Sequence, residues 1–265
     1  MIFSAAKTIM TNRKRLLFII LSALILLPAA GCEDMPPNTV HSIGDVNGKA
    51  IGALTGSPSI VLAEELGTAL EYGTSEQLMT YLKSGILDCV IMESTAAAEL
   101  VAETSGVRIL SESLLEYDIR FAVAKENAAL LRAVNSALAA LRDNGVLRGL
   151  IGKYFAGRNY TYTPPEDVQK RPGSVTLAVA PENRPFSQKN EEGLFSGLDI
   201  DVTQAVCDFL GVGLTILEFD GRDLINAVWL GWADLSLGWV PVEGEDVVDI
   251  SDAYTTSTQV VIVRR

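Results

Sequence analysis

Histidine and cysteine are scarce in this sequence, which has one histidine and three cysteines among 265 residues. Zinc sites and Ser–His–Asp triads need these residue types at defined positions, so the sequence argues against both and predicts neither a metal nor a cofactor. Cys89 and Cys207 stand inside the apolar stretches "DCVIM" and "AVCDFL". Small buried residues are typical of such stretches, so we expect two free buried thiols rather than a disulfide.

Basic residues are also few, because 21 Lys and Arg stand against 33 Asp and Glu, a net charge of −12. Binding of nucleic acid requires a basic patch or stripe, so no nucleic-acid partner is expected. The composition, 48% hydrophobic and 20% charged, is instead that of a globular protein with enough apolar residues for a packed core.

The N-terminal apolar run, residues 16–30, is 15 residues long and so falls short of the roughly 20 that a transmembrane helix needs. Basic residues precede it and small residues follow it, which predicts an export signal at residues 1–31. The small residues 29–31 directly before Cys32 resemble a bacterial lipobox, so we expect Cys32 to be lipidated and to anchor the protein to the cell membrane on its extracytoplasmic side. An ordinary secretory signal followed by an incidental cysteine is the alternative.

After a polar tether at residues 32–42, strand-like and helix-like stretches alternate twice along the chain. The first series starts with "KAIGALTG" and the helix "SPSIVLAEELG", in which Ser57 is the expected cap and Pro58 the first helical residue. The second series starts at "VTLAVA" and ends with the strand "TQVVIV", and "RNYTYTPPEDVQKRPG" separates the two. This alternation predicts an α/β fold of two lobes, each with a mainly parallel, covered sheet.

Several motifs resemble one known family. The second half contains "RPFSQKNEEGLFSGLDIDVTQAVCDFLGV", "LINAVWLGWADLSLG" and "VVDISDAYTTSTQVVIVRR", and the first half contains "LMTYLKSGILDCVIMEST". These are similar to elements of the polar amino-acid binding family of bacterial extracytoplasmic solute-binding proteins, which serve ABC importers. The resemblance implies a type II periplasmic-binding-protein-like fold with an interlobe cleft, a small-molecule ligand, an ABC permease as partner, a monomer and no enzymatic activity.

The order of these motifs is reversed relative to the family, which predicts a circular permutation. The expected division is a ligand-binding lobe 2 at residues 43–123, closing helices of lobe 1 at 124–157, a permutation linker at 158–173 and the lobe 1 core at 174–265. A single covalent crossing is expected near residues 123–126, with the other crossing cut open at residues 263–265. A swapped dimer is the alternative.

The resemblance also implies ligand-binding residues in the cleft. The helix N-terminus at Thr55, Gly56, Ser57 and Ser59 is predicted to bind an anionic group, with an ordinary helix cap as the alternative. Glu93 is predicted to pair with an ammonium group. Three aromatic residues are candidate walls of the cleft, although each taken alone fits the core better because aromatic side chains bury large areas, and they are Phe186, Trp239 and Tyr254.

The arginine with which the family clamps a ligand carboxylate has no counterpart here, because the matching segment is the acidic "WVPVEGEDVVDISD". Arg120 and Arg184 are candidate substitutes. Otherwise Glu243, Glu245 and Asp246 near Trp239 favour a cationic ligand.

The sequence therefore predicts a lipid-anchored solute-binding component of an ABC importer that binds an amino acid or a similar small polar solute. Three alternatives stay open. They are a binder of a cationic amine, a non-transport sensor or scaffold, and a dehydratase-like enzyme in which carboxylates such as Glu93 act as general acid or base.

Overall fold

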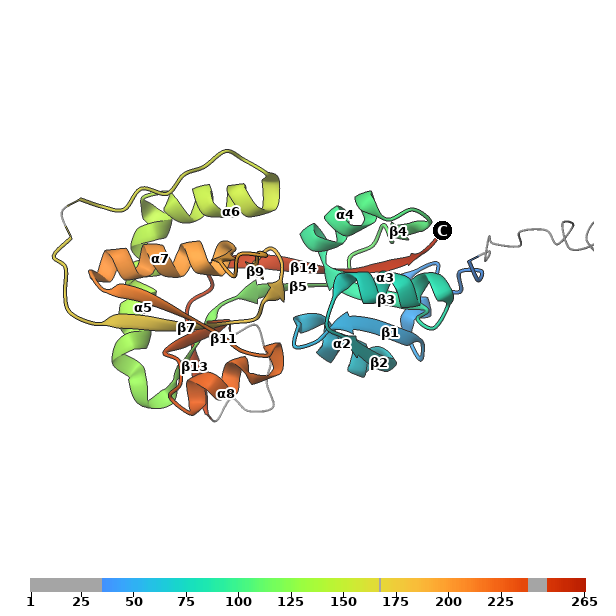
Figure 1. Ribbon diagram of the computed structural model, residues 1–265, viewed down its shortest axis with the longest axis horizontal. Coiled ribbons are helices and arrows are strands. Elements are labelled where there is room, and N and C mark those ends of the chain that lie inside the picture. The colour runs from blue at the N-terminus through green and yellow to red at the C-terminus, as the bar shows by residue number, and fades with distance from the viewer. Residues whose placement is uncertain (1–34, 167, 238–246) are drawn as a thin grey trace, which may run out of the picture. The chain divides into compact units, whose positions relative to one another are not determined.

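The computed structural model describes residues 35–166, 168–237 and 247–265 (Figure 1). The predicted signal peptide, Cys32, Trp239, Glu243, Glu245 and Asp246 lie outside the described residues. Within the described residues, no helix is both long enough and apolar enough to cross a membrane.

The first of two large sheets has the strand order β2-β1-β3-β14-β4, and β5 also pairs with β14. Strand β1 pairs in parallel with β2 and β3, whereas β14 is antiparallel to its three partners. The strands are β1 (Ala50–Leu54), β2 (Thr68–Tyr72), β3 (Cys89–Glu93), β4 (Val107–Ile109), β5 (Leu115–Ile119) and β14 (Thr255–Arg264). The helical segments of this part are η1 (Ile43–Val46), α2 (Pro58–Leu66), α3 (Ser75–Ser84) and α4 (Ser94–Glu103).

The second large sheet has the order β11-β7-β12-β6-β13, in which β7 is parallel to β11 and β12 and β6 is antiparallel to β12 and β13. Its strands are β6 (Phe121–Ala124), β7 (Ser174–Val179), β11 (Gly213–Glu218), β12 (Leu235–Leu237) and β13 (Val248–Ile250). Its helical segments are η2 (Lys125–Asn127), α5 (Ala128–Asp143), α6 (Val146–Ala156), α7 (Leu198–Leu210), η3 (Gly221–Asp223) and α8 (Leu224–Trp229). A small antiparallel sheet consists of β8 (Glu182–Asn183), β9 (Ser187–Lys189) and β10 (Phe195–Ser196).

The predicted two-lobed α/β fold is confirmed, with mixed rather than mainly parallel sheets. The helix boundaries follow the local sequence signals. Helix α2 has Ser57 at its N-cap and Pro58 at its first position. Helix α3 begins after Thr74, whose hydroxyl accepts a hydrogen bond from the Gln77 N–H at 3.3 Å, and ends at Gly85 with φ of 80°, a left-handed conformation that suits glycine.

Strand β14 corrects the predicted division of the chain. The sequence placed residues 255–265 in lobe 1, which corresponds to the second sheet, but β14 lies in the first sheet between β3 and β4, beside β5 (Figure 1). Residues 121–123, predicted for lobe 2, which corresponds to the first sheet, belong to β6 of the second sheet. The physical reason is burial, because residues 260–264 of β14 are all buried and an extended segment of this kind needs hydrogen-bonding neighbours on both edges.

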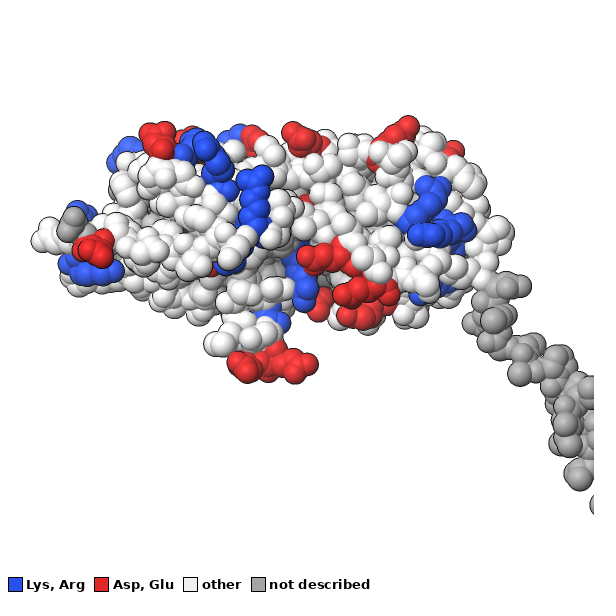
Figure 2. All heavy atoms as spheres, turned by 90° about the horizontal axis from the view of Figure 1, so that it is seen from above, with Lys and Arg blue, Asp and Glu red and all other residues white. Residues whose placement is uncertain are grey.

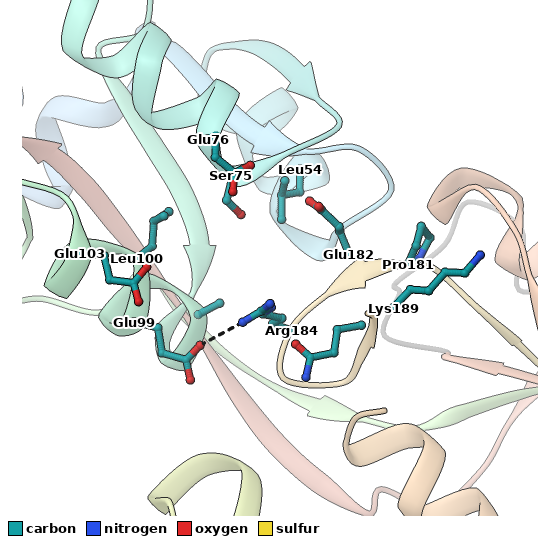
Figure 3. Close-up of a pocket in the computed structure, with 12 residues that line it drawn as sticks. Leu54, Ser75, Glu76, Glu99, Leu100, Glu103, Pro181, Glu182, Arg184 and Lys189 are labelled. Atoms are coloured by element: carbon teal, nitrogen blue, oxygen red, sulfur yellow. Dashed lines mark ion pairs between the residues drawn. The ribbon is translucent and has the colours of Figure 1, made fainter. Parts of the chain in front are cut away.

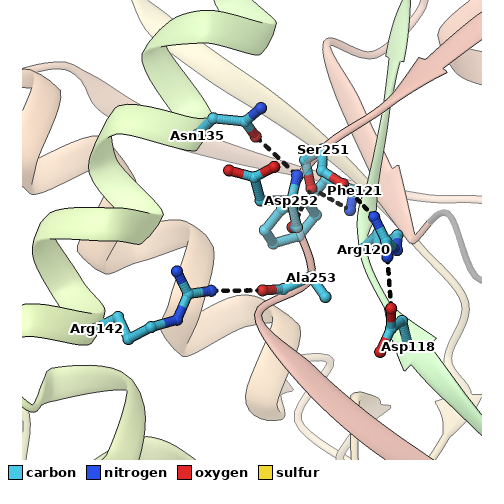
Figure 4. Close-up of polar contacts among 8 residues, drawn as sticks. All are labelled: Asp118, Arg120, Phe121, Asn135, Arg142, Ser251, Asp252 and Ala253. Atoms are coloured by element: carbon cyan, nitrogen blue, oxygen red, sulfur yellow. Dashed lines mark hydrogen bonds and ion pairs between the residues drawn. The ribbon is translucent and has the colours of Figure 1, made fainter.

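The predicted crossings near residues 123–126 and 263–265 are therefore wrong. Among the described residues, the two sheets are joined covalently at two places, through Arg120 between β5 and β6 and through residues 251–254 between β13 and β14. Side chains of the second lobe hold the latter connection. Arg142 donates to the Ala253 carbonyl at 2.7 Å and Asn135 accepts from the Asp252 N–H at 2.9 Å (Figure 4).

Arg264, the last residue of β14, is 2% exposed although it is charged. Its guanidinium donates to the carbonyls of Pro36 at 3.0 Å and of Leu82 at 2.7 Å, and also to those of Leu87 and Pro37. The Leu82 carbonyl belongs to the last turn of α3 and also accepts from the Gly85 N–H at 3.2 Å, and the negative end of the helix macrodipole favours a cation there. Arg264 thus connects the segment at Pro36 and Pro37 to α3 and to the centre of the first sheet.

We predict that Arg264→Met lowers the free energy of unfolding by about 3 kcal/mol, because it removes a buried charged donor and its hydrogen bonds, two of which are buried bonds to the Leu82 and Leu87 carbonyls. Urea unfolding followed by circular dichroism measures this value. Arg265→Met is the matched control, since the exposed Arg265 side chain makes a bond to the Val107 carbonyl and its loss should cost under about 1 kcal/mol. Equal losses for the two variants would contradict the role assigned to Arg264.

Candidate functional site

The candidate site lies where parallel strands of both sheets end. In the first sheet β1 lies between β2 and β3, and in the second sheet β7 lies between β11 and β12. Each of these two strands therefore has parallel neighbours on both sides, and the strand order reverses at β1 and at β7. Such switch points leave a crevice at the carboxyl ends of the strands, where ligands of open α/β sheets bind. Leu54 ends β1, and Val179 ends β7 just before Pro181 and Glu182.

Three neighbouring cavities occupy this region. The first has a volume of about 210 Å³ and is shown in Figure 3. A second, more open one of about 530 Å³ is lined by residues such as Thr55, Phe219 and Asp220. The third is only about 20 Å³, which holds roughly one water molecule, and its lining includes Glu93, Tyr117 and Gln259.

The 210 Å³ cavity is lined by more acidic than basic side chains. Four glutamates line it, and they are Glu76, Glu99, Glu103 and Glu182. The basic residues in its lining are both paired with carboxylates. Arg184 pairs with Glu99 at 3.9 Å (Figure 3), and Lys189 pairs with Glu218. Burial raises the pKa of Glu182 above its ordinary value and the Glu76 carboxylate raises it further, against the lowering effect of Arg184. Bringing a cation into this cavity would relieve the repulsion between Glu76 and Glu182.

Glu93 lies at the 20 Å³ cavity, but its carboxylate is already engaged by the protein. It caps α4 by accepting from the N–H groups of Thr95 at 2.8 Å and Ala96 at 3.0 Å. Its other oxygen accepts from the hydroxyls of Ser94 at 3.0 Å and Ser257 at 3.2 Å. Burial raises the pKa of Glu93, and these hydrogen bonds oppose the shift. A residue predicted to bind an ammonium group therefore also serves as a helix cap.

A second buried network connects α2 to the connecting strands. The Ser59 hydroxyl donates to Gln259 Oε1 at 2.6 Å, and Gln259 Nε2 donates to the Tyr117 hydroxyl at 3.0 Å. Gln259 is fully buried, so its amide orientation is determined by these two partners. Ser57 donates to the Leu54 carbonyl at 2.7 Å. The polar side chains in the first turn of α2 are thus bound to the protein itself.

Thr55 and Gly56 lie where the two lobes make contact. A Cβ atom on Gly56 would lie 2.3 Å from the Gly221 backbone, and one on Gly221 would lie 2.8 Å from Gly56 Cα. Gly56 also has φ of 67°, which side chains rarely adopt. The lobes therefore approach each other through backbone contact beside the 530 Å³ cavity, which Thr55 and Gly221 both line.

The two arginines predicted as substitutes for the missing clamp lie in different places. Arg184 lines both the 210 Å³ and the 20 Å³ cavities. Arg120 lines none of the three described above. It pairs with Asp118 and donates to the Ser251 carbonyl at 3.3 Å, so it connects the two segments that join the lobes (Figure 4).

Of the predicted aromatic residues, Phe186 lines the 20 Å³ cavity and is 1% exposed, and Tyr254 is part of the core. The Tyr254 ring stacks on Phe121 with centroids 4.6 Å apart, and its hydroxyl donates to the buried Asp199 carboxylate. Burial raises the pKa of Asp199 to about 7, and the hydrogen bond from Tyr254 opposes this shift. Tyr254 therefore stabilises the region where β14 begins.

Tyr117, Gln259, Leu54 and Glu182 line the cavities and were absent from the predicted set. The ends of β1 and β7 are recognisable in the sequence, which would have indicated Leu54 and Glu182. Nothing in the sequence places Gln259 beside Tyr117, because they are 142 residues apart. In the described part of the chain, no group of three or more His, Cys, Asp or Glu side chains is arranged to hold a metal ion.

The charge on one face of the molecule does not have the pattern of a nucleic-acid interface. On the face seen in Figure 2, basic side chains lie in small separate groups between acidic ones. A polyanion needs a continuous basic surface, which this face does not offer.

Comparison with known proteins confirms the resemblance for part of the chain. Residues 175–265 match the model of the bacterial extracellular solute-binding proteins, family 3. The L-cystine-binding protein TcyJ of Escherichia coli K12 is 26% identical over 121 residues, which are 44% of this chain and 46% of that protein. The chain thus matches about half the length of this curated relative.

Solved structures that match the chain include an L-glutamate complex of the GluR0 ligand-binding core, with a TM-score of 0.44 and 10% identity over 82% of this chain and 85% of that one. Another is the ancestral amino acid-binding protein AncCDT-1, a precursor of cyclohexadienyl dehydratase, with a TM-score of 0.43 and 14% identity over 86% of each chain. These likenesses are too weak to carry an inference about the ligand.

We predict that Glu93→Ala lowers the free energy of unfolding by about 1–2 kcal/mol, because α4 loses its cap and Ser257 loses an acceptor. Thermal or urea unfolding measures the loss. Glu99→Ala in the same helix is the control, since its exposed pair with Arg184 should contribute under about 1 kcal/mol. Unchanged stability of Glu93→Ala would contradict the capping role.

We predict that Asp199 makes stability depend on pH. Its pKa is higher in the folded state, about 7, than the ordinary value of 3.8. The stabilising contribution of the protonated carboxyl is therefore complete below pH 3.8 and is lost as the pH rises through about 7. Asp199→Asn, which still accepts from Tyr254, should flatten the fall in unfolding free energy between pH 4 and 7, and equal slopes for both proteins would contradict this assignment.

Proposed function

We propose that the whole chain is a solute-binding protein of this family and that it binds an amino acid or a similar small polar solute between its lobes. The main support is the placement of the 210 Å³ cavity at the carboxyl ends of β1 and β7, with lining residues from both lobes. The family match over residues 175–265 covers β7 to β13 and also β14, which belongs to the first sheet. An interlobe site of this kind suits a binder that closes around its ligand.

The charges of the cavity favour a solute that carries a cationic group. Its glutamates outnumber its basic side chains, and both basic side chains are paired with carboxylates. Arg184 would hold the carboxylate of an amino acid if it released Glu99. The ion pair between Arg184 and Glu99 is exposed and 3.9 Å long, so it contributes little stability and breaking it costs little free energy. A cationic amino acid or an amine therefore fits the site better than an acidic one.

Transport is the wider role that we propose. Lipidation at Cys32 would hold the protein on the extracytoplasmic side of the membrane, where an ABC permease would receive the solute. The reversed order of the motifs is the basis for proposing a circular permutation, with the chain acting as a monomer. TcyJ, which matches part of this chain, is named for binding L-cystine, so cystine is included among the candidate solutes.

Two other functions compete with this proposal. A sensor or scaffold would bind solutes weakly or not at all, and a dehydratase-like enzyme would convert what it binds. The capping bonds of Glu93 disfavour it as a general acid or base, because its oxygens are occupied by four donors.

The test is ligand-dependent stabilisation of the full chain in mild detergent, with L-lysine, cadaverine, spermidine, L-cystine and L-glutamate as probes. A probe at a hundred times its Kd should add about 2.7 kcal/mol to the free energy of unfolding. We expect stabilisation by the cationic probes and a weaker effect or none with L-glutamate. No stabilisation by any probe would contradict the proposal, and conversion of a probe would favour an enzyme.

Charge-neutralising variants test where the cation binds. Glu182→Gln should weaken binding of cadaverine about tenfold, because it removes a carboxylate from the cavity lining without changing its size. Glu116→Gln is the matched control, since Glu116 is exposed on β5 and lines none of the three cavities. Equal affinities of both variants would place the cation elsewhere.

A further inference from the structure

Leu54 lies at the junction of the three cavities of the candidate site. It is the last residue of β1, is half-buried, and lines the 20 Å³, the 210 Å³ and the 530 Å³ cavities alike. Figure 3 shows its side chain in the same cavity as Ser75, Glu76 and Glu182. A single branched apolar side chain therefore borders spaces that differ greatly in size and polarity.

The three cavities around Leu54 differ in their lining side chains, and neighbouring cavities share some of them. The 20 Å³ cavity is lined by polar groups that are held in place, among them Glu93, Tyr117 and Gln259. It shares Ala96 and Arg184 with the 210 Å³ cavity in addition to Leu54. The 210 Å³ cavity in turn shares Pro181 and Glu182 with the 530 Å³ cavity.

The side chains shared between neighbouring cavities differ in how firmly they are placed. Arg184 and Glu182 are exposed and charged, so they reorient at little cost. Ala96 is too small to close a passage. Leu54 packs with the buried cluster that includes Leu78 and Val90, so its position is determined by the core. Among these four side chains, Leu54 is therefore the one that the core holds in place.

We propose that Leu54 determines the length of the solute that the cleft accepts, by closing the 210 Å³ cavity toward its neighbours. This inference rests on the proposed function. A solute that fills the 210 Å³ cavity ends against the Leu54 side chain, whereas a longer one would have to displace it. Shortening Leu54 joins the cavities and admits a longer ligand.

The test compares cadaverine, a short diamine, with spermidine, a longer triamine, in binding to the full chain by calorimetry. In Leu54→Ala, the ratio of the affinity for spermidine to that for cadaverine should rise about tenfold, since one or two methylene groups are worth 10-fold or more in a shaped pocket. Leu54→Phe should lower the affinity for both probes. An unchanged ratio in Leu54→Ala would overturn the proposal.

Leu70→Ala is the matched control, because Leu70 belongs to the same apolar cluster but lines none of the three cavities. It should lose stability without a change in the ratio, and an equal change in the ratio would overturn the proposal. Should Leu54→Ala fail to fold, Leu54→Val gives the same test with a smaller expected rise.

The proposed function and this inference fail in different ways. Absence of binding of both probes to the unmodified protein would overturn the proposed binding of cationic solutes, and the role of Leu54 with it. Binding by the unmodified protein with an unchanged ratio in the Leu54 variants would leave the function supported and overturn the role of Leu54 alone.

Discussion

The antiparallel pairing of β14 with β3, β4 and β5 is the constraint on which the rest of the structure depends. Because β14 starts directly after the connection from β13, its pairing determines where one lobe ends and the other begins. It also brings Ser257 to Glu93 and Gln259 to Ser59. A strand that is buried along its second half has no other way to satisfy its backbone groups.

The polar groups at the base of the cleft are largely satisfied within the protein. Glu93 caps α4, Gln259 connects Ser59 to Tyr117, and Ser57 donates to the carbonyl of Leu54. Each of these hydrogen bonds contributes about 1 kcal/mol. A ligand that bound to these side chains would have to form hydrogen bonds that compensate for those it disrupts. A ligand binds the exposed carboxylates around the 210 Å³ cavity at a lower cost in free energy, because solvent already screens their interactions with the protein. This difference is why the acidic cavity, rather than Glu93, is the centre of the proposed function.

The predictions from sequence were most accurate where the physical signal is local. Ser57 and Pro58 start α2, and the stretch "TQVVIV" is a strand, as predicted. Of the candidate site residues, Ser57, Ser59, Glu93, Arg184 and Phe186 line one cavity. Arg120 and Tyr254 do not line it, because the one connects the segments between the lobes and the other packs against Phe121 and Asp199.

The sequence by itself determined the α/β class, the order of the elements, the acidic charge and the resemblance that residues 175–265 bear out. Caps, turns and hydrophobic periodicity act over a few residues, so they are visible in the chain. Only the tertiary structure decided which sheet receives β14, which polar groups satisfy one another and that Leu54 borders three cavities. These features depend on contacts between residues far apart in the chain, such as Ser59 and Gln259, which are 200 residues apart, and no local preference specifies them.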